Sequence, residues 1–149
     1  NIRAMKEAGG SVERVSQLEA ATGGLAKGFE ILSGDDSLTL PFMSVGAVGV
    51  ISVASNLIPA EMAALVAGML EDRWRDARSL HRRYYRLFNA FLRLDTNPVP
   101  IKTALGLIGA MEPTVRRPLA SMRSAGVEEL EVLLTELEIT SIQPVGATS

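Results

Sequence analysis

The chain has 149 residues, of which 47% are hydrophobic, enough for one ordinary domain with a buried core. Its formal net charge of −2 gives no electrostatic reason to expect a polyanionic partner such as nucleic acid. Because it contains no cysteine, a disulfide framework, a thiolate zinc site and a cysteine nucleophile are excluded. No apolar run reaches the roughly 20 residues of a membrane helix. We therefore expect a soluble, cytoplasmic protein without a membrane partner.

Strand and helix signals alternate three times along the first 71 residues. We expect strands at 2–5, 29–32 and 49–53, and helices at about 12–21, 37–45 and 60–70. Ser11 is a good N-cap for the first helix, and Asp35 or Asp36 can cap the second. Pro59 suits the first turn of the third. The strands are almost continuously apolar, which is typical of a parallel sheet covered by helices.

The character of the sequence changes after Glu71, where strand signals end. We expect helices at about 74–92, 101–108 and 127–137, a rigid turn at DTNPVPIK, and a loose tail at ITSIQPVGATS. Residues 1–71 are therefore predicted to be an α/β part and residues 72–149 a helical domain with a tail. Three strands leave both edges of a parallel sheet open, so another segment must complete it.

Lys6 follows the first predicted strand, on the side where parallel α/β folds carry their chemistry. Removal of the amine from water disfavours the charged ammonium and leaves a nucleophile for a carbonyl group. A solvated lysine, or one paired with Glu7, explains the position as well. Position alone favours that simpler interpretation.

Four stretches of the sequence, taken together, favour a nucleophilic Lys6 over a solvated one. They are MKEAGGSVERV, LSGDDSLTLPFMSVGAVGVISVASN, ARSLHRR and NPVPIKTAL. In order and spacing they resemble the dihydrodipicolinate synthase family, and the resemblance covers about the first 140 residues. Each stretch is weak by itself, whereas their combination is specific.

The resemblance implies a (β/α)8 TIM barrel with an appended C-terminal helical domain, of which this chain would hold strands six to eight and that domain. It implies a lyase of lysine (diaminopimelate) biosynthesis that condenses pyruvate with aspartate semialdehyde to 4-hydroxy-tetrahydrodipicolinate. Lys6 matches the lysine that forms an imine with pyruvate. Gly34 and Ile51 match positions that shape the pyruvate pocket. The covalent imine requires no cofactor and no metal.

The family's proton relay and the groups that bind the substrate carboxylates belong to strands one to five, which have no counterpart here. We therefore expect a C-terminal half that is inactive without its N-terminal half, within a homo-oligomer, either a dimer or a tetramer. Two alternatives remain: a non-catalytic half-barrel that serves as a scaffold or assembly piece, and a related aldolase that cleaves sialic acid or keto-deoxy sugar acids. Gly9, where many relatives carry threonine or serine, is a mild departure.

The remaining polar candidates have simpler explanations. Lys27 in a glycine-rich turn is expected to be solvated, and Lys102 and His81 to be structural. A single histidine provides no metal cluster. Asp35 and Asp36 are better explained by helix capping than by a magnesium site. The arginines between residues 73 and 93 alternate with apolar residues, which predicts an amphipathic helix with a solvated basic face.

Overall fold

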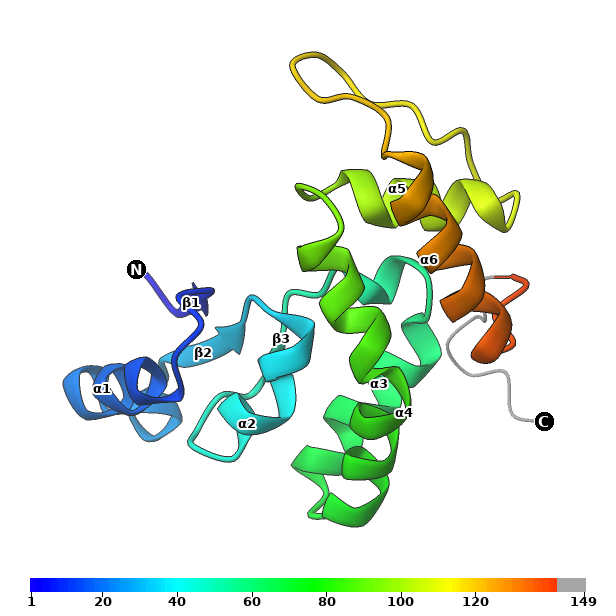
Figure 1. Ribbon diagram of the computed structural model, residues 1–149. Coiled ribbons are helices and arrows are strands. Elements are labelled where there is room, and N and C mark those ends of the chain that lie inside the picture. Colours follow the sequence, from blue (N-terminus) through cyan, green and yellow to red (C-terminus); the bar gives the residue numbers. More distant parts are fainter. Residues whose placement is uncertain (142–149) are drawn as a thin grey trace. The chain divides into compact units, whose positions relative to one another are not determined.

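The computed structural model describes residues 1–141, which form a mixed α/β fold (Figure 1). The strands are β1 (Ala4–Glu7), β2 (Glu30–Ser33) and β3 (Gly49–Val50). The α-helices are α1 (Val12–Thr22), α2 (Thr39–Met43), α3 (Pro59–Leu70), α4 (Trp74–Arg93), α5 (Val99–Leu107) and α6 (Ser124–Glu136). Short 3-10 helices occupy Gly24–Lys27, Asp36–Leu38 and Ala54–Asn56. Most of the predicted tail, from residue 142 onward, lies outside the described residues.

The chain divides into two compact units. The first contains Asn1–Ser52 and Met62–His81, and the second contains Val53–Glu61 and the residues from Arg82 onward. The predicted division at residue 72 stays a prediction. All three strands, and all three residues predicted for the site, belong to the first unit.

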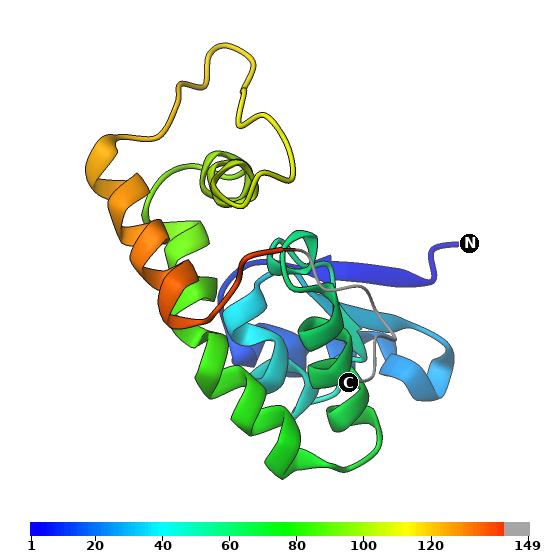
Figure 2. The ribbon, with the colours of Figure 1, turned by 90° about the vertical axis from the view of Figure 1, so that its right-hand side faces the viewer.

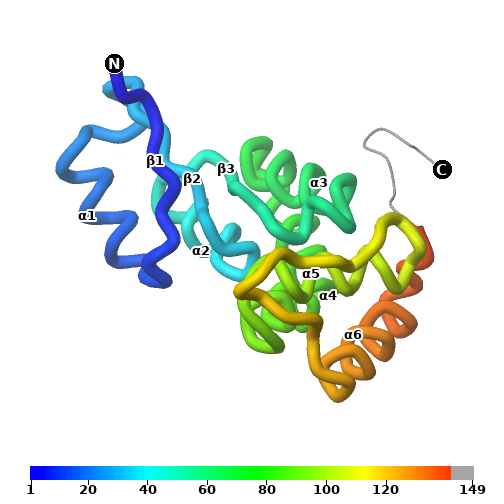
Figure 3. The backbone as a smooth tube through the Cα atoms, turned by 90° about the horizontal axis from the view of Figure 1, so that it is seen from above, coloured from blue at the N-terminus to red at the C-terminus, as the bar shows by residue number. Residues whose placement is uncertain are grey.

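The strands of the first unit form one parallel sheet in the order β1-β2-β3, as the sequence predicted (Figure 3). Lys6 pairs with Leu32, and Leu32 with Gly49. Side chains alternate along a strand, so Lys6 and Leu32 project from one face of the sheet. Glu7 and Ser33, which also pair, project from the other.

Helices α1 and α2 cover the face to which Glu7 and Ser33 belong. Val15 of α1 and Phe42 of α2 are fully buried and pack with Ile31 of β2 and with Ala47. Figure 1 and Figure 2 show both helices below the strands. This cluster is the core of the sheet, and it leaves the Lys6 face on the opposite side.

The predicted helices are present, but the one predicted at 37–45 is divided into a 3-10 helix at Asp36–Leu38 and the short α2 at Thr39–Met43. α5 and α6 begin two and three residues earlier than predicted. Ser11 occupies the N-cap position of α1 with extended backbone, although its side chain makes no capping hydrogen bond. Gly23 ends α1 in the left-handed conformation, at φ 76°, which glycine adopts without strain. Asp35 caps the next turn, because its carboxylate accepts the Ser37 N–H at 2.8 Å. Pro59 begins α3.

Two predicted strands were misplaced. β1 covers Ala4–Glu7 rather than 2–5, because its pairing with β2 runs from Ala4 to Glu7, while Ile2 is 77% exposed. Lys6 therefore lies inside the strand, one residue before its end. β3 stops at Val50 rather than at residue 53, since β2 ends at Ser33, the partner of Val50.

The second unit is helical in the part of the chain that the structure describes. α5 packs against α6, and the buried residues of these helices include Ile101 and Leu105 of α5 and Leu130 and Leu134 of α6. The C-terminal half of α4 buries residues at helical spacing, among them Leu87, Phe88 and Phe91. The predicted amphipathic character of the arginine-rich segment is confirmed.

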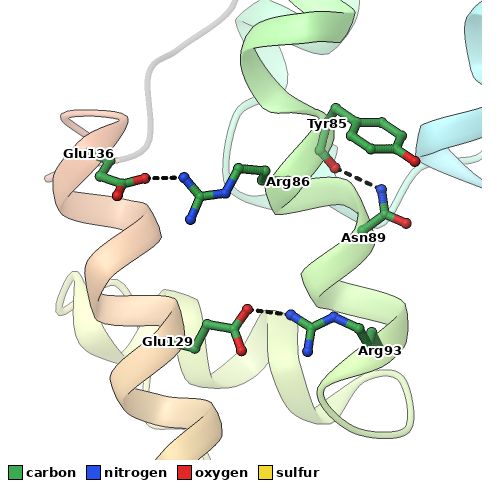
Figure 4. Close-up of polar contacts among 6 residues, drawn as sticks. All are labelled: Tyr85, Arg86, Asn89, Arg93, Glu129 and Glu136. Carbon is green, nitrogen blue, oxygen red and sulfur yellow. Dashed lines mark hydrogen bonds and ion pairs between the residues drawn. The ribbon is translucent and has the colours of Figure 1, made fainter.

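Two arginines of α4 form ion pairs with glutamates of α6 on the exposed side of this unit. Arg86 donates to Glu136 and Arg93 donates to Glu129 (Figure 4). Both pairs bridge the same two helices, and all four side chains are largely solvent-exposed. The positive charges of Arg86 and Arg93 are thus partly neutralised by glutamates of the same chain, which agrees with a solvated helix face.

None of the helices within residues 1–141 combines the length and the apolar character that crossing a membrane requires.

Substitution Phe42→Ala tests the sheet core. Phe42 is 0% exposed, so loss of its ring should lower the free energy of unfolding by about 3–5 kcal/mol. The control is Leu25→Ala at a residue that is 58% exposed, where we expect a change below about 0.5 kcal/mol. Urea unfolding followed by circular dichroism measures both, and equal effects of the two substitutions would contradict this core.

Two neighbouring residues of α6 separate packing from charge in the second unit. Leu130→Ala should cost about 2–5 kcal/mol because Leu130 is fully buried. Glu129→Gln removes an exposed ion pair and should cost at most about 1 kcal/mol. The same urea measurement compares them; a larger loss for Glu129→Gln would show that the charge pairs hold this unit together.

Candidate active site

The three strands end at a common level, and two main-chain hydrogen bonds extend the ladder by one residue. The Gly34 N–H donates to the carbonyl of Glu7 at 2.7 Å. The Ile51 N–H donates to the carbonyl of Ser33, also at 2.7 Å. Gly34 and Ile51 are therefore the first residues beyond β2 and β3. Small ligands bind at this carboxyl edge in parallel α/β folds.

The Lys6 side chain extends over Gly34. A Cβ atom on Gly34 would lie 2.8 Å from Cε of Lys6, closer than real Cβ contacts come. It would also lie 2.6 Å from Cβ of Ala8 and 3.1 Å from the carbonyl oxygen of Glu7. Glycine at position 34 thus provides the space that the lysine side chain uses. Lys6 itself is exposed in this chain.

Ile51 reaches the same edge through its main chain. Its N–H is fixed by Ser33, while its side chain is 48% exposed. The structure therefore brings Lys6 and Gly34 into direct proximity and holds Ile51 at the same level by strand register. The roles predicted for these three residues remain predictions.

The loop that follows Gly34 is fixed by side-chain hydrogen bonds. The fully buried Ser33 donates through its hydroxyl to the carbonyl of Asp35 at 2.8 Å and accepts the Asp35 N–H at 3.2 Å. The Asp35 carboxylate accepts both the N–H and the hydroxyl of Ser37, each at 2.8 Å. Thr39 donates to the Asp35 carbonyl at 3.2 Å. Asp35 therefore acts as a cap, as predicted.

Two residues near Lys6 were not predicted to contribute to the site, although Glu7 was considered as an ion-pair partner of Lys6. Leu32 is the cross-strand neighbour of Lys6, and its side chain lies over Gly49. A Cβ atom added to Gly49 would lie 3.3 Å from Cδ2 of Leu32. Glu7 is only 5% exposed although it carries a carboxylate. Strand alternation from Lys6 could have predicted that Glu7 points toward the helices, where Arg14 of α1 offers a positive charge.

The other candidates lie elsewhere in the chain and keep their structural explanations. Lys27 is exposed at the end of a 3-10 helix. Lys102 donates from Nζ to the carbonyl of Thr114. His81 lies in α4, where partial burial lowers the pKa of its imidazole. Residues 1–141 hold no group of three histidine, aspartate or glutamate side chains that could bind a metal ion.

Comparisons with known proteins agree with the resemblance stated from the sequence. A profile of the Dihydrodipicolinate synthetase family matches residues 1–137. The 4-hydroxy-tetrahydrodipicolinate synthase of Persephonella marina is 44% identical over 137 residues, which are 91% of this chain and 45% of that protein. That of Koribacter versatilis is 41% identical over 136 residues, which are 91% and 44% of the two chains.

Solved structures give the same result. The 4-hydroxy-tetrahydrodipicolinate synthase from Methylacidiphilum fumariolicum SolV matches with a TM-score of 0.87 at 51% identity, over 92% of this chain and 44% of that chain. The dihydrodipicolinate synthase from Aquifex aeolicus matches with a TM-score of 0.88 at 39% identity, over 95% and 47% of the chains. A monomeric dihydrodipicolinate synthase variant matches with a TM-score of 0.86 at 32% identity, over 92% and 45%.

The chain spans about half the length of the curated relatives it matches. The family profile nevertheless covers nearly the whole of this chain, and the solved relatives share its fold over the same region. The chain therefore belongs to the dihydrodipicolinate synthetase family.

Proposed function

We propose that this chain is the imine-forming half of a pyruvate-condensing (β/α)8 barrel, to which it supplies strands six to eight and the helices that follow. One observation carries the proposal: the side chain of Lys6 lies over Gly34 at the carboxyl edge of a parallel sheet. Barrel enzymes bind their substrates at this edge. Family membership supports the same assignment.

The reaction starts with attack of the neutral Lys6 amine on the C2 carbonyl of pyruvate, and water leaves as the imine forms. The protonated imine withdraws electrons, so the methyl group loses a proton and an enamine results. The enamine carbon then adds to the aldehyde of aspartate semialdehyde. The amino group of this second substrate attacks the imine carbon, closes the ring and releases Lys6, giving 4-hydroxy-tetrahydrodipicolinate.

Gly34 and Ile51 shape the pocket in this proposal and take no part in proton transfer. Glycine at 34 leaves room for Lys6 and for the small keto acid beside it. The main chain at Ile51, held by Ser33, forms the neighbouring wall. No metal or organic cofactor is required, since the covalent imine itself is the electron sink.

A complementary segment completes the barrel. The outer edge of β1 has no partner strand within residues 1–141, and parallel sheets normally have both faces covered and their edges protected. Such a segment would also shield Lys6 from water and thereby favour the neutral amine. We propose that it corresponds to the part that precedes this region in full-length relatives, and that the completed enzyme forms homo-oligomers.

A rival function is favoured by the exposure of Lys6 in this chain. In that case the chain is a half-barrel that binds its complementary half, or another copy of itself, through the open sheet edge without forming an imine. The two functions differ in one measurable property, namely whether pyruvate reacts with Lys6.

Borohydride trapping distinguishes them. The chain is incubated with pyruvate and sodium borohydride, alone and mixed with the complementary segment of a full-length relative, and the adduct is mapped by mass spectrometry. We expect a reduced pyruvate adduct on Lys6, formed faster in the mixture because the completed pocket orients the reactants.

The other two lysines are internal controls for this experiment. Lys27 is exposed, and the Lys102 ammonium donates a hydrogen bond to the main-chain carbonyl of Thr114, so neither lysine should be labelled above background. Lys6→Arg should abolish the adduct while the fold is kept. Equal labelling of all three lysines, or no adduct on Lys6 in the mixture, would leave the scaffold as the remaining function.

Gly34→Ala tests the position of the lysine. The new methyl group would meet Cε of Lys6 and Cβ of Ala8, so the lysine side chain should be displaced. We expect the trapping rate in the mixture to fall by about tenfold or more, since small misplacements of reacting groups are costly. The control Gly126→Ala adds the same methyl group to α6, where the three nearest atoms all belong to the flexible side chain of Met122, at 3.3–3.4 Å. Equal rates for the two variants would contradict the proposed geometry.

A further inference from the structure

The turn after β1 is organised around the buried carboxylate of Glu7. Its Oε1 accepts the Gly9 N–H at 2.5 Å, and its Oε2 lies 3.6 Å from Nε of Arg14 in α1. The main-chain carbonyl of the same residue accepts the Gly34 N–H at 2.7 Å. One residue therefore joins the end of β1 to its own turn, to α1 and to the loop after β2.

Gly9 is what allows the Glu7 carboxylate to fold back in this way. A Cβ atom on Gly9 would lie 2.6 Å from Oε1 of Glu7, within the space that the carboxylate fills. Gly10, the next residue, has nothing within 4 Å of its corresponding position. The close contact is therefore specific to Gly9, and a side chain at that position would displace the carboxylate.

We propose that Glu7 is a positioning residue for Lys6: its carboxylate, seated against Gly9, fixes the turn so that the Glu7 carbonyl holds Gly34 beneath the lysine side chain. Glu7 projects from the opposite face of the sheet to Lys6, so it acts through the backbone and touches neither the amine nor the substrate. The effect of Glu7 on imine formation rests on the proposed function. Its effect on the conformation of the turn is independent of that function.

The carboxylate acts chiefly as a hydrogen-bond acceptor in this arrangement. Nε of the half-exposed Arg14 lies 3.6 Å from Oε2, beyond hydrogen-bond distance, whereas the Gly9 N–H lies 2.5 Å from Oε1. The Gly9 bond is short and partly buried, so its loss leaves a donor without its partner. Glutamine can accept the same bond, whereas alanine cannot.

The first arm of the test follows the turn by amide hydrogen exchange, read by NMR on the complete 149-residue chain. In Glu7→Ala and in Gly9→Ala, we expect the Gly9 and Gly34 amides to exchange roughly fivefold faster or more, as for a lost hydrogen bond. In Glu7→Gln and in Arg14→Gln, both amides should exchange within about twofold of the native rate. Native exchange rates for Gly9 and Gly34 in Glu7→Ala would overturn the proposal.

The second arm compares two reactions of Lys6 in the same variants, mixed with the complementary segment. Pyruvate trapping depends on where the amine lies, whereas acetylation by acetic anhydride depends only on its accessibility and charge. In Glu7→Ala, we expect trapping to fall by about tenfold while acetylation changes less than about twofold, and Glu7→Gln should restore trapping. A purely structural role would leave trapping and acetylation unchanged relative to each other in every folded variant, and that result would also overturn the proposal.

Failure of the proposed function has a different signature. If pyruvate does not label Lys6 of the unsubstituted chain mixed with the complementary segment, the imine chemistry is wrong. The exchange of Gly9 and Gly34 still decides whether Glu7 fixes the turn.

Discussion

The main-chain ladder at the carboxyl edge of the sheet fixes everything else in the candidate site. Its last two bonds join Gly34 to Glu7 and Ile51 to Ser33, and they bring three segments distant in sequence to one level. A slip of one residue in this ladder would turn Lys6 toward the face that α1 and α2 cover. The buried cluster of Val15, Ile31 and Phe42 opposes such a slip, because it requires apolar residues on that face.

Two glycines near this ladder provide space and not only flexibility. Gly34 leaves room for the Lys6 side chain, and Gly9 leaves room for the Glu7 carboxylate. Lys6 and Glu7 are neighbours in sequence but project from opposite faces of β1, so they can serve different purposes. In the proposed enzyme, Lys6 carries the chemistry, while Glu7 holds the turn that keeps Gly34 in place.

The sequence alone predicted the parallel strands, the helix cap at Asp35, and the amphipathic helix that became α4. These features depend on local periodicity and on residues with strong conformational preferences. It missed the ends of β1 and β3, because a strand ends where its partner ends, and pairing is not local. It also missed the burial of Glu7, which depends on α1 covering that face. Lys6 was chosen by motif resemblance, since position alone favoured a solvated lysine.

The most direct test of the account is a crystal structure of this chain bound to the complementary segment of a full-length relative and soaked with pyruvate. We predict continuous electron density from Nζ of Lys6 to C2 of the bound keto acid, directly above Gly34 and beside the main chain of Ile51. Pyruvate bound elsewhere, with Lys6 directed away from Gly34, would contradict it.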